Sequence, residues 1–170
     1  MSRLIAAVPG ATFADGSVAD VELWWSTTPV PDDTVFAAMA VVTDAVGRYA
    51  VAWSPRRQEW GIPGGWREVG ESVVECVVRE VWEETGLRLD PGRLQACGHE
   101  DLAPRTVGVW PPEGGSMQLF RITIPEVGPD LVAAEPDAVD PTWVSAHEFE
   151  ALSGGQFWWP LVAAAMAAEQ

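Results

Sequence analysis

The residues of this 170-residue chain with the clearest chemical potential are three glutamates, Glu80, Glu83 and Glu84. They lie in the segment GWREVGESVVECVVREVWEETGL, which runs from Gly65 to Leu87 and contains no lysine. At about 100° per residue, the three side chains fall on one side of a helix. Like charges four positions apart destabilise a helix by roughly 0.2–0.5 kcal/mol. The cluster therefore predicts that a bound cation holds these carboxylates.

The donor types indicate which cation this would be. Carboxylate oxygens clustered without histidine or thiolate favour Mg²⁺ or Mn²⁺ over Zn²⁺. Magnesium keeps several waters and usually completes its coordination shell with phosphate oxygens. Gly64 and Gly65 lie just before the expected helix and would let the backbone approach an ion or a phosphate closely. Together these features indicate metal-assisted attack of water on phosphorus.

A helix positions the glutamates. Ser72 is its expected N-cap, Glu75 completes a capping box, and Gly86 fits just past the C-terminal end. The residues that form an apolar stripe at helical spacing are Val74, Val77, Val78, Val81 and Thr85. This stripe should pack on a sheet, with the three glutamates roughly opposite to it.

The rest of the chain predicts a sheet covered by helices. The expected strands are 20–27, 35–44, 48–54, 60–62, 94–102, 117–124 and 142–144, with a weaker one at 106–110. The expected helices after the first are 146–152 and 158–168. Residues 35–54 are predicted to form a hairpin, and residues 1–19 to be loosely ordered. We therefore expect one α/β domain over residues 1–170, a sandwich with a mixed sheet between helical layers.

The segment 65–87 resembles the signature of the Nudix (MutT-like) hydrolases, G-x5-E-x7-R-E-U-x-E-E-x-G-U, where U is a bulky aliphatic residue. Every specified position is matched, from Gly65 and Glu71 through Arg79-Glu80-Val81 and Glu83-Glu84 to Gly86-Leu87. Such a complete match at fixed spacing is highly specific. The preceding WGIPGG is similar to the W-x-L-P-G-G lead-in common in that family. The resemblance implies an α/β/α sandwich over residues 20–168.

The resemblance also implies an activity and its residues. Family members use Mg²⁺ or Mn²⁺ to cut the pyrophosphate of a nucleoside diphosphate linked to another group. Glu80, Glu83, Glu84 and the carbonyl of Gly64 would be metal ligands, with Glu71 a further or indirect one. Arg79 would orient the glutamates by ion pairing. The general base stays open between Glu80 and three downstream residues, which are Glu100, Asp101 and Glu113.

The substrate is less well defined by the sequence. Arg56, Arg57 and Arg105 could contact phosphates, and Trp66 follows the double glycine on a loop where it could face the cleft. The loop-rich segment 106–116 is expected to carry substrate-specific contacts. No motif downstream of the signature selects among nucleoside triphosphates, damaged nucleotides, and ADP-ribose or other nucleotide sugars.

Composition excludes some partners. The net charge of −15 argues against nucleic acid and anionic membranes, which require a basic surface. Cys76 and Cys97 are expected to be reduced thiols of a cytoplasmic protein. The tryptophan-rich ends favour a homodimer over a monomer. Two alternatives stay open: a solvated charged helix, and a catalytically silent domain that only binds a nucleotide or a protein.

Overall fold

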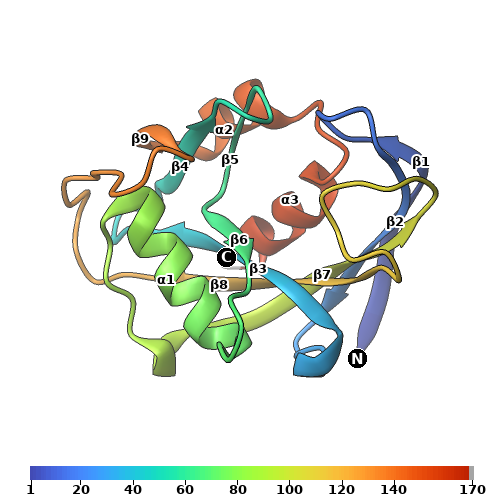
Figure 1. Ribbon diagram of the computed structural model, residues 1–170. Helices are drawn as coiled ribbons and strands as arrows, with labels where there is room; N and C mark the ends of the chain where they lie inside the picture. Colours follow the sequence, from blue (N-terminus) through green and yellow to red (C-terminus); the bar gives the residue numbers. More distant parts are fainter. Residues whose placement is uncertain (169–170) are drawn as a thin grey trace.

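A nine-stranded mixed sheet forms the centre of the molecule, as the computed structural model of residues 1–168 shows (Figure 1). The strand order is β1-β2-β7-β8-β3-β4-β5, with β6 paired to β3 and β9 paired to β4. The strands are β1 Ser2–Thr12, β2 Val18–Ser26, β3 Val35–Thr43, β4 Tyr49–Ser54, β5 Glu59–Gly61, β6 Gly64–Trp66, β7 Gln95–Pro104, β8 Gly115–Thr123 and β9 Val139–Val144. Within residues 1–168, β3 and β8 are the only strands that pair in parallel, and the other pairs are antiparallel.

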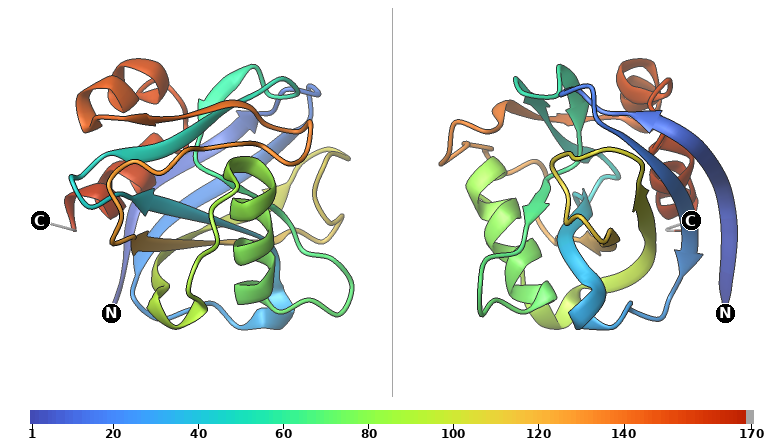
Figure 2. Two further views of the ribbon diagram at one scale, coloured as in Figure 1. Left: turned by 90° about the vertical axis from the view of Figure 1, so that its left-hand side faces the viewer. Right: turned by 45° about the vertical axis from the view of Figure 1, so that its right-hand side comes forward.

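Helices cover both faces of this sheet (Figures 1 and 2). On one face lies α1 (Val73–Thr85), whose apolar residues, among them Val77 and Val81, pack against β3 and β8. On the other face lie α2 (Ala146–Ser153) and α3 (Trp159–Ala167), which bury Phe149 and Leu161 in a second core. The predicted α/β/α sandwich is thus confirmed. No helix within residues 1–168 is long and apolar enough to cross a membrane.

The ends of α1 form as the sequence predicts. The Ser72 hydroxyl accepts from the Glu75 N–H, and the Glu75 carboxylate accepts from the Ser72 N–H, which completes the capping box. Gly86 ends the helix with φ of 76°, a left-handed conformation that favours glycine. These local signals fix the helix register and therefore the side of the helix on which the glutamates lie.

The expectation of a loosely ordered N-terminus is wrong. Residues 2–12 form β1, which pairs with β2 at the edge of the sheet. Pro9 and Gly10 both lie where the register shifts between Val8 and Ala11. An edge strand tolerates a proline, and a bulge absorbs an extra residue. The Gly10 N–H donates instead to the Asp20 side chain over 2.8 Å.

Two other local predictions also differ from the structure. Residues 106–110 form no strand; this loop turns back so that the buried Trp110 ring packs edge-on against Phe13 at 4.5 Å. In the predicted hairpin, β3 and β4 pair only at Thr43 and Tyr49, because β3 pairs with β6 and β8 along most of its length. Long-range strand pairing has decided this arrangement, and a short-range turn signal cannot reveal it.

Candidate functional site

The glutamates of α1 lie against the backbone of β6. Glu84 is only 8% exposed, and its carboxylate accepts a hydrogen bond from the Gly64 N–H over 3.2 Å. A Cβ on Gly65 would lie 2.5 Å from the Glu80 carboxylate, closer than any real contact allows. Gly65 therefore admits the Glu80 carboxylate, which a larger residue would displace, whereas a Cβ on Gly64 would collide with Met39 and Ala38 of β3. The acidic side of α1 is thus packed against the protein, as is its valine stripe.

Arg79 is the cation at the centre of this cluster. Its Nε and Nη2 atoms donate to the two oxygens of Glu71, over 2.6 and 3.1 Å. Its Nη1 donates to Glu80 over 2.8 Å and to Glu83 over 3.1 Å, while Nη2 also reaches the Trp66 carbonyl. Because the guanidinium is a rigid, planar fork of donors, Arg79 orients three carboxylates at once.

Arg79 does not balance all the negative charge of the glutamate cluster. Burial raises the pKa of Glu84 to about 8, and the neighbouring charge of Glu80 contributes to this rise. Burial also raises the pKa of Glu80, although Arg79 opposes the shift. Glu71 behaves differently, because its hydrogen bonds from Arg79 lower its pKa. The ionised forms of Glu80 and Glu84 therefore need a further positive charge nearby.

The donor set fits a hard divalent cation, but the side chains do not converge on one point. Among the described residues, no group of three or more His, Cys, Asp or Glu side chains is arranged to hold a metal ion. Glu80 and Glu83 turn toward Arg79, and Glu84 turns toward Gly64. Their chemistry, carboxylate oxygens without nitrogen or sulfur donors, is the kind that Mg²⁺ and Mn²⁺ prefer.

A family model described as the NUDIX domain matches residues 33–164, most of the chain. The chain belongs to the Nudix family. The segment 65–87 is thus a Nudix box in sequence, and in the structure it forms the loop and helix just described. Membership in this family supports a hydrolase related to nucleotides.

A curated relative carries the same similarity over a short stretch. The chain is 36% identical over 63 residues to a nucleoside triphosphate pyrophosphatase/Nudix hydrolase fusion protein of Bifidobacterium longum. That match covers 37% of this chain and 13% of the relative. The matched region therefore spans about an eighth of the fusion protein's length.

Solved structures share the fold. The NUDIX domain of Shewanella oneidensis NrtR, complexed with ADP ribose, superposes with a TM-score of 0.60 at 14% identity, covering 80% of this chain and 87% of that one. The Bacillus subtilis pyrophosphohydrolase BsRppH gives a TM-score of 0.56 at 16% identity, covering 81% and 77%. A MutT protein from Methanosarcina mazei gives 0.56 at 19% identity, covering 79% and 94%.

A cavity of about 330 Å³ lies beside the Nudix box. Arg56, Arg57 and Trp66 line it, as the sequence suggested for substrate contacts, and so do Val109 and Trp110 of the segment 106–116. Arg57 lines the cavity, and its positive charge opposes the rise in the pKa of Glu84. Arg105 does not line the cavity; it pairs with Asp20 over 2.8 Å at the surface.

The downstream acidic residues occupy different places. Glu100 is buried and lines the cavity, whereas Asp101 accepts from the Ser116 hydroxyl and lines a separate hollow with His99. Glu113 is exposed in the loop before β8. Of these three, only Glu100 faces the cavity beside the box.

Asp137 was not among the site residues predicted from the sequence. Its charge raises the pKa of Glu84, although it lies more than 50 positions along the chain. The segment before it crosses the end of α1, where the N–H groups of Ala134 and Glu135 donate to the Glu83 carbonyl. No spacing rule marks this loop acid, so only the tertiary structure brings it to the box.

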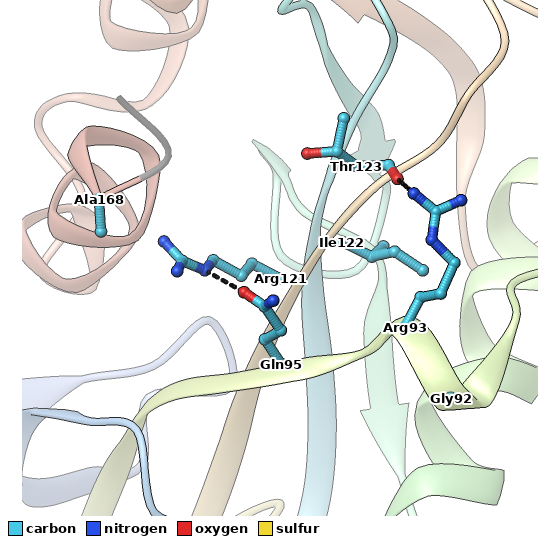
Figure 3. A pocket seen from close by; sticks show the side chains of 7 residues that line it. All are labelled: Gly92, Arg93, Gln95, Arg121, Ile122, Thr123 and Ala168. Carbon is cyan, nitrogen blue, oxygen red and sulfur yellow. Dashed lines mark hydrogen bonds between the residues drawn. The ribbon is translucent and has the colours of Figure 1, made fainter.

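A further hollow, of about 410 Å³ and distinct from the two just described, lies beside β7 and β8 (Figure 3). Arg121 donates to the Gln95 side chain and Arg93 to the Thr123 carbonyl. In Figure 3 the guanidinium of Arg121, on β8, and that of Arg93, in the 3-10 helix before β7, lie on opposite sides of β8. They do not converge on a common ligand, and no residue of the Nudix box lines this hollow.

Proposed function

We propose that this chain is a Mg²⁺- or Mn²⁺-dependent hydrolase that cleaves the pyrophosphate bond of a nucleoside diphosphate linked to another moiety. One observation carries the proposal. The glutamate cluster of the Nudix box lies beside a cavity of nucleotide-binding size. Arg57 lines this cavity, and its positive charge favours the ionised forms of Glu84, in the box, and of Glu100, in the cavity wall.

The residues of the box have different proposed roles. Glu80, Glu83, Glu84 and the carbonyl of Gly64 would hold the metal, which supplies charge neutralisation for the phosphates and activation of water. Arg79 positions Glu80 and Glu83, and Glu71 acts through Arg79. Glu80 is the proposed proton acceptor, with Glu100 as the alternative, because Glu100 is the one downstream candidate that lines the cavity beside the box.

The cavity suits the nucleoside part of the substrate. Its aromatic lining, which includes Phe36 and Trp66 at a centroid distance of 5.1 Å, offers faces on which a base can stack. Arg56 and Arg57 at the same cavity could donate to phosphate oxygens. Proposed substrates are nucleoside triphosphates, damaged nucleotides, and ADP-ribose or other nucleotide sugars; the ADP ribose bound to the NrtR domain supports the last class.

A product-release screen tests the proposal. The purified chain is incubated with Mg²⁺ and a panel of nucleoside triphosphates, ADP-ribose, nucleotide sugars and diadenosine polyphosphates, with a phosphatase that acts only on products. Mg²⁺-dependent release from one class, lost in Glu83→Gln, is the expected result. No release from any compound, with nucleotide binding retained, would instead favour the catalytically silent domain.

The cytoplasmic location and the homodimeric state of the protein are also proposals. Cys76 and Cys97 are both buried thiols, which supports the proposed cytoplasmic location. The proposed homodimer rests on the tryptophan-rich ends, and sedimentation of the purified chain would measure it. The proposed partner is a small nucleotide, and nucleic acid and membranes are not expected ligands because the net charge is −15.

A further inference from the structure

Glu100 is a buried carboxylate without a partner. It lies on β7, is 4% exposed and lines the cavity beside the Nudix box. Among the described residues, none donates a hydrogen bond to its side chain, and none forms an ion pair with it. Burying a carboxylate without donors is costly, so such groups in native proteins usually serve a ligand or water.

The nearest charges do not satisfy this carboxylate. Arg57 attracts it and Glu59 repels it. However, the Arg57 Nε lies 3.7 Å from the Glu59 carboxylate, and Glu59 also accepts from the Trp158 indole N–H. Arg57 is thus held by Glu59, and the two oxygens of Glu100 stay available to groups in the cavity.

The cavity around Glu100 suits a flat ring. Two aromatic pairs line it, Phe36 with Trp66 and Phe13 with Trp110. Aromatic walls bind the faces of a heterocycle, whereas a carboxylate at the wall binds donors on the edge of that heterocycle. A base in this cavity would therefore be selected by the hydrogen-bond pattern of its edge.

We propose that Glu100 determines specificity by binding the edge of a guanine-type base through its ring N–H and its exocyclic amino group. The inference rests on the proposed function, since it names the nucleotide class of the same site. A carboxylate has two acceptor oxygens side by side, and guanine presents two adjacent N–H donors. The corresponding edges of adenine and cytosine place a lone pair next to the amino group, which repels one carboxylate oxygen.

Guanine binding would also offset the energetic cost of burying the Glu100 carboxylate. Burial raises the pKa of this carboxyl to about 7. Two N–H donors would stabilise the ionised form, as hydrogen bonds to a carboxylate do. Hypoxanthine keeps the ring N–H and lacks the amino group, so it would lose one of the two bonds.

The test is a binding measurement without metal. Calorimetry compares GMP, IMP and AMP as ligands of the wild type, of Glu100→Gln, and of a control variant, Glu126→Gln, whose side chain is exposed outside the cavity. The wild type and the control should bind GMP roughly 10- to 100-fold more tightly than IMP or AMP. Glu100→Gln should lose that preference by weakening GMP alone.

Two results would overturn the inference. One is a wild type that binds GMP, IMP and AMP equally, a comparison that requires no variant. The other is a folded Glu100→Gln protein that keeps the full preference for GMP. Because neither metal nor hydrolysis enters this measurement, guanine selectivity without Mg²⁺-dependent cleavage of any guanine nucleotide, whether triphosphate, damaged nucleotide or nucleotide sugar, would refute the proposed activity and leave this inference standing.

Discussion

The guanidinium of Arg79 binds both carboxylate oxygens of Glu71, which lies eight positions earlier in the chain, over 2.6 and 3.1 Å. This bidentate pair joins the loop before α1 to the helix that carries the proposed metal ligands. The same arginine reaches Glu80 and Glu83 through its remaining donors. The position of the acidic cluster therefore depends on one cation.

Removing that cation should destabilise the fold. Arg79→Met leaves Glu71, Glu80 and Glu83 without their shared partner, and we expect the free energy of unfolding to fall by about 3 kcal/mol. Urea denaturation without metal measures the loss. The control is Arg88→Met, since Arg88 lies over the Trp82 ring at 5.7 Å and pairs with no carboxylate among the described residues. Equal stability of the two variants would contradict the central role of Arg79.

Neutralising a proposed metal ligand should separate activity from stability. We expect Glu84→Gln to lower kcat by about 100-fold or more, because it removes a metal ligand. Its stability should stay equal or rise, because Glu84 is a buried, repelled carboxylate. Glu75→Gln is the matched control, as a glutamine also completes a capping box on the same helix. Wild-type turnover of Glu84→Gln at saturating Mg²⁺ would refute the ligand assignment.

Adding a single methyl group at the double glycine should disturb the metal site. Gly65→Ala places a Cβ 2.5 Å from the Glu80 carboxylate, so the Kd for Mg²⁺ should rise by about tenfold, a cost of roughly 1.4 kcal/mol. Gly155→Ala is the control, because a Cβ at that position would meet nothing within 4 Å. Calorimetric titration with Mg²⁺ compares the two, and matching Kd values would count against contact between Glu80 and the metal.

Metal binding should stabilise the folded chain. Mg²⁺ at a hundred times its Kd should add about 2.7 kcal/mol to the free energy of unfolding, because the unfolded chain has no such site. Thermal melting in the presence and absence of Mg²⁺ measures this as a rise in Tm. Glu83→Gln should show a smaller rise. A Tm of the wild type that does not change with Mg²⁺ would argue against a preformed site.

The buried Glu100 predicts a pH dependence of stability. Burial raises its pKa to about 7, with Glu59 adding to the shift and Arg57 opposing it. Below about pH 4 the carboxyl is protonated in both states, so it has no effect. As the pH rises toward 7, the unfolded chain ionises first, and the folded state loses about 3 kcal/mol of stability.

Glu100→Gln should remove that loss. The stability of the variant relative to the wild type should therefore increase between pH 5 and pH 8, as measured by urea denaturation at both values. Arg56 and Asp15 also line the cavity and stay unchanged in the comparison. Glu126→Gln, at an exposed position outside the cavity, should follow the wild type at both pH values. Parallel curves for Glu100→Gln and the wild type would contradict the burial argument.

Local signals in the sequence determined much of this protein. Ser72, Glu75 and Gly86 fix the ends of α1, since capping depends on residues within a few positions of each other. The spacing of Arg79, Glu80, Glu83 and Glu84 places them together on the same turns of the helix. The family signature could be read for the same reason, because it lies within one continuous segment.

Contacts between distant segments were decided by the tertiary structure. Glu100 and Asp101 are neighbours in sequence, yet alternation along β7 sends one side chain into the cavity and the other to a separate hollow. Asp137 approaches Glu84 because its loop crosses the end of α1. The parallel pairing of β3 with β8 likewise joins residues about 80 positions apart. Local patterns specify helices, caps and strands, whereas the long-range packing of the core selects which of their side chains meet.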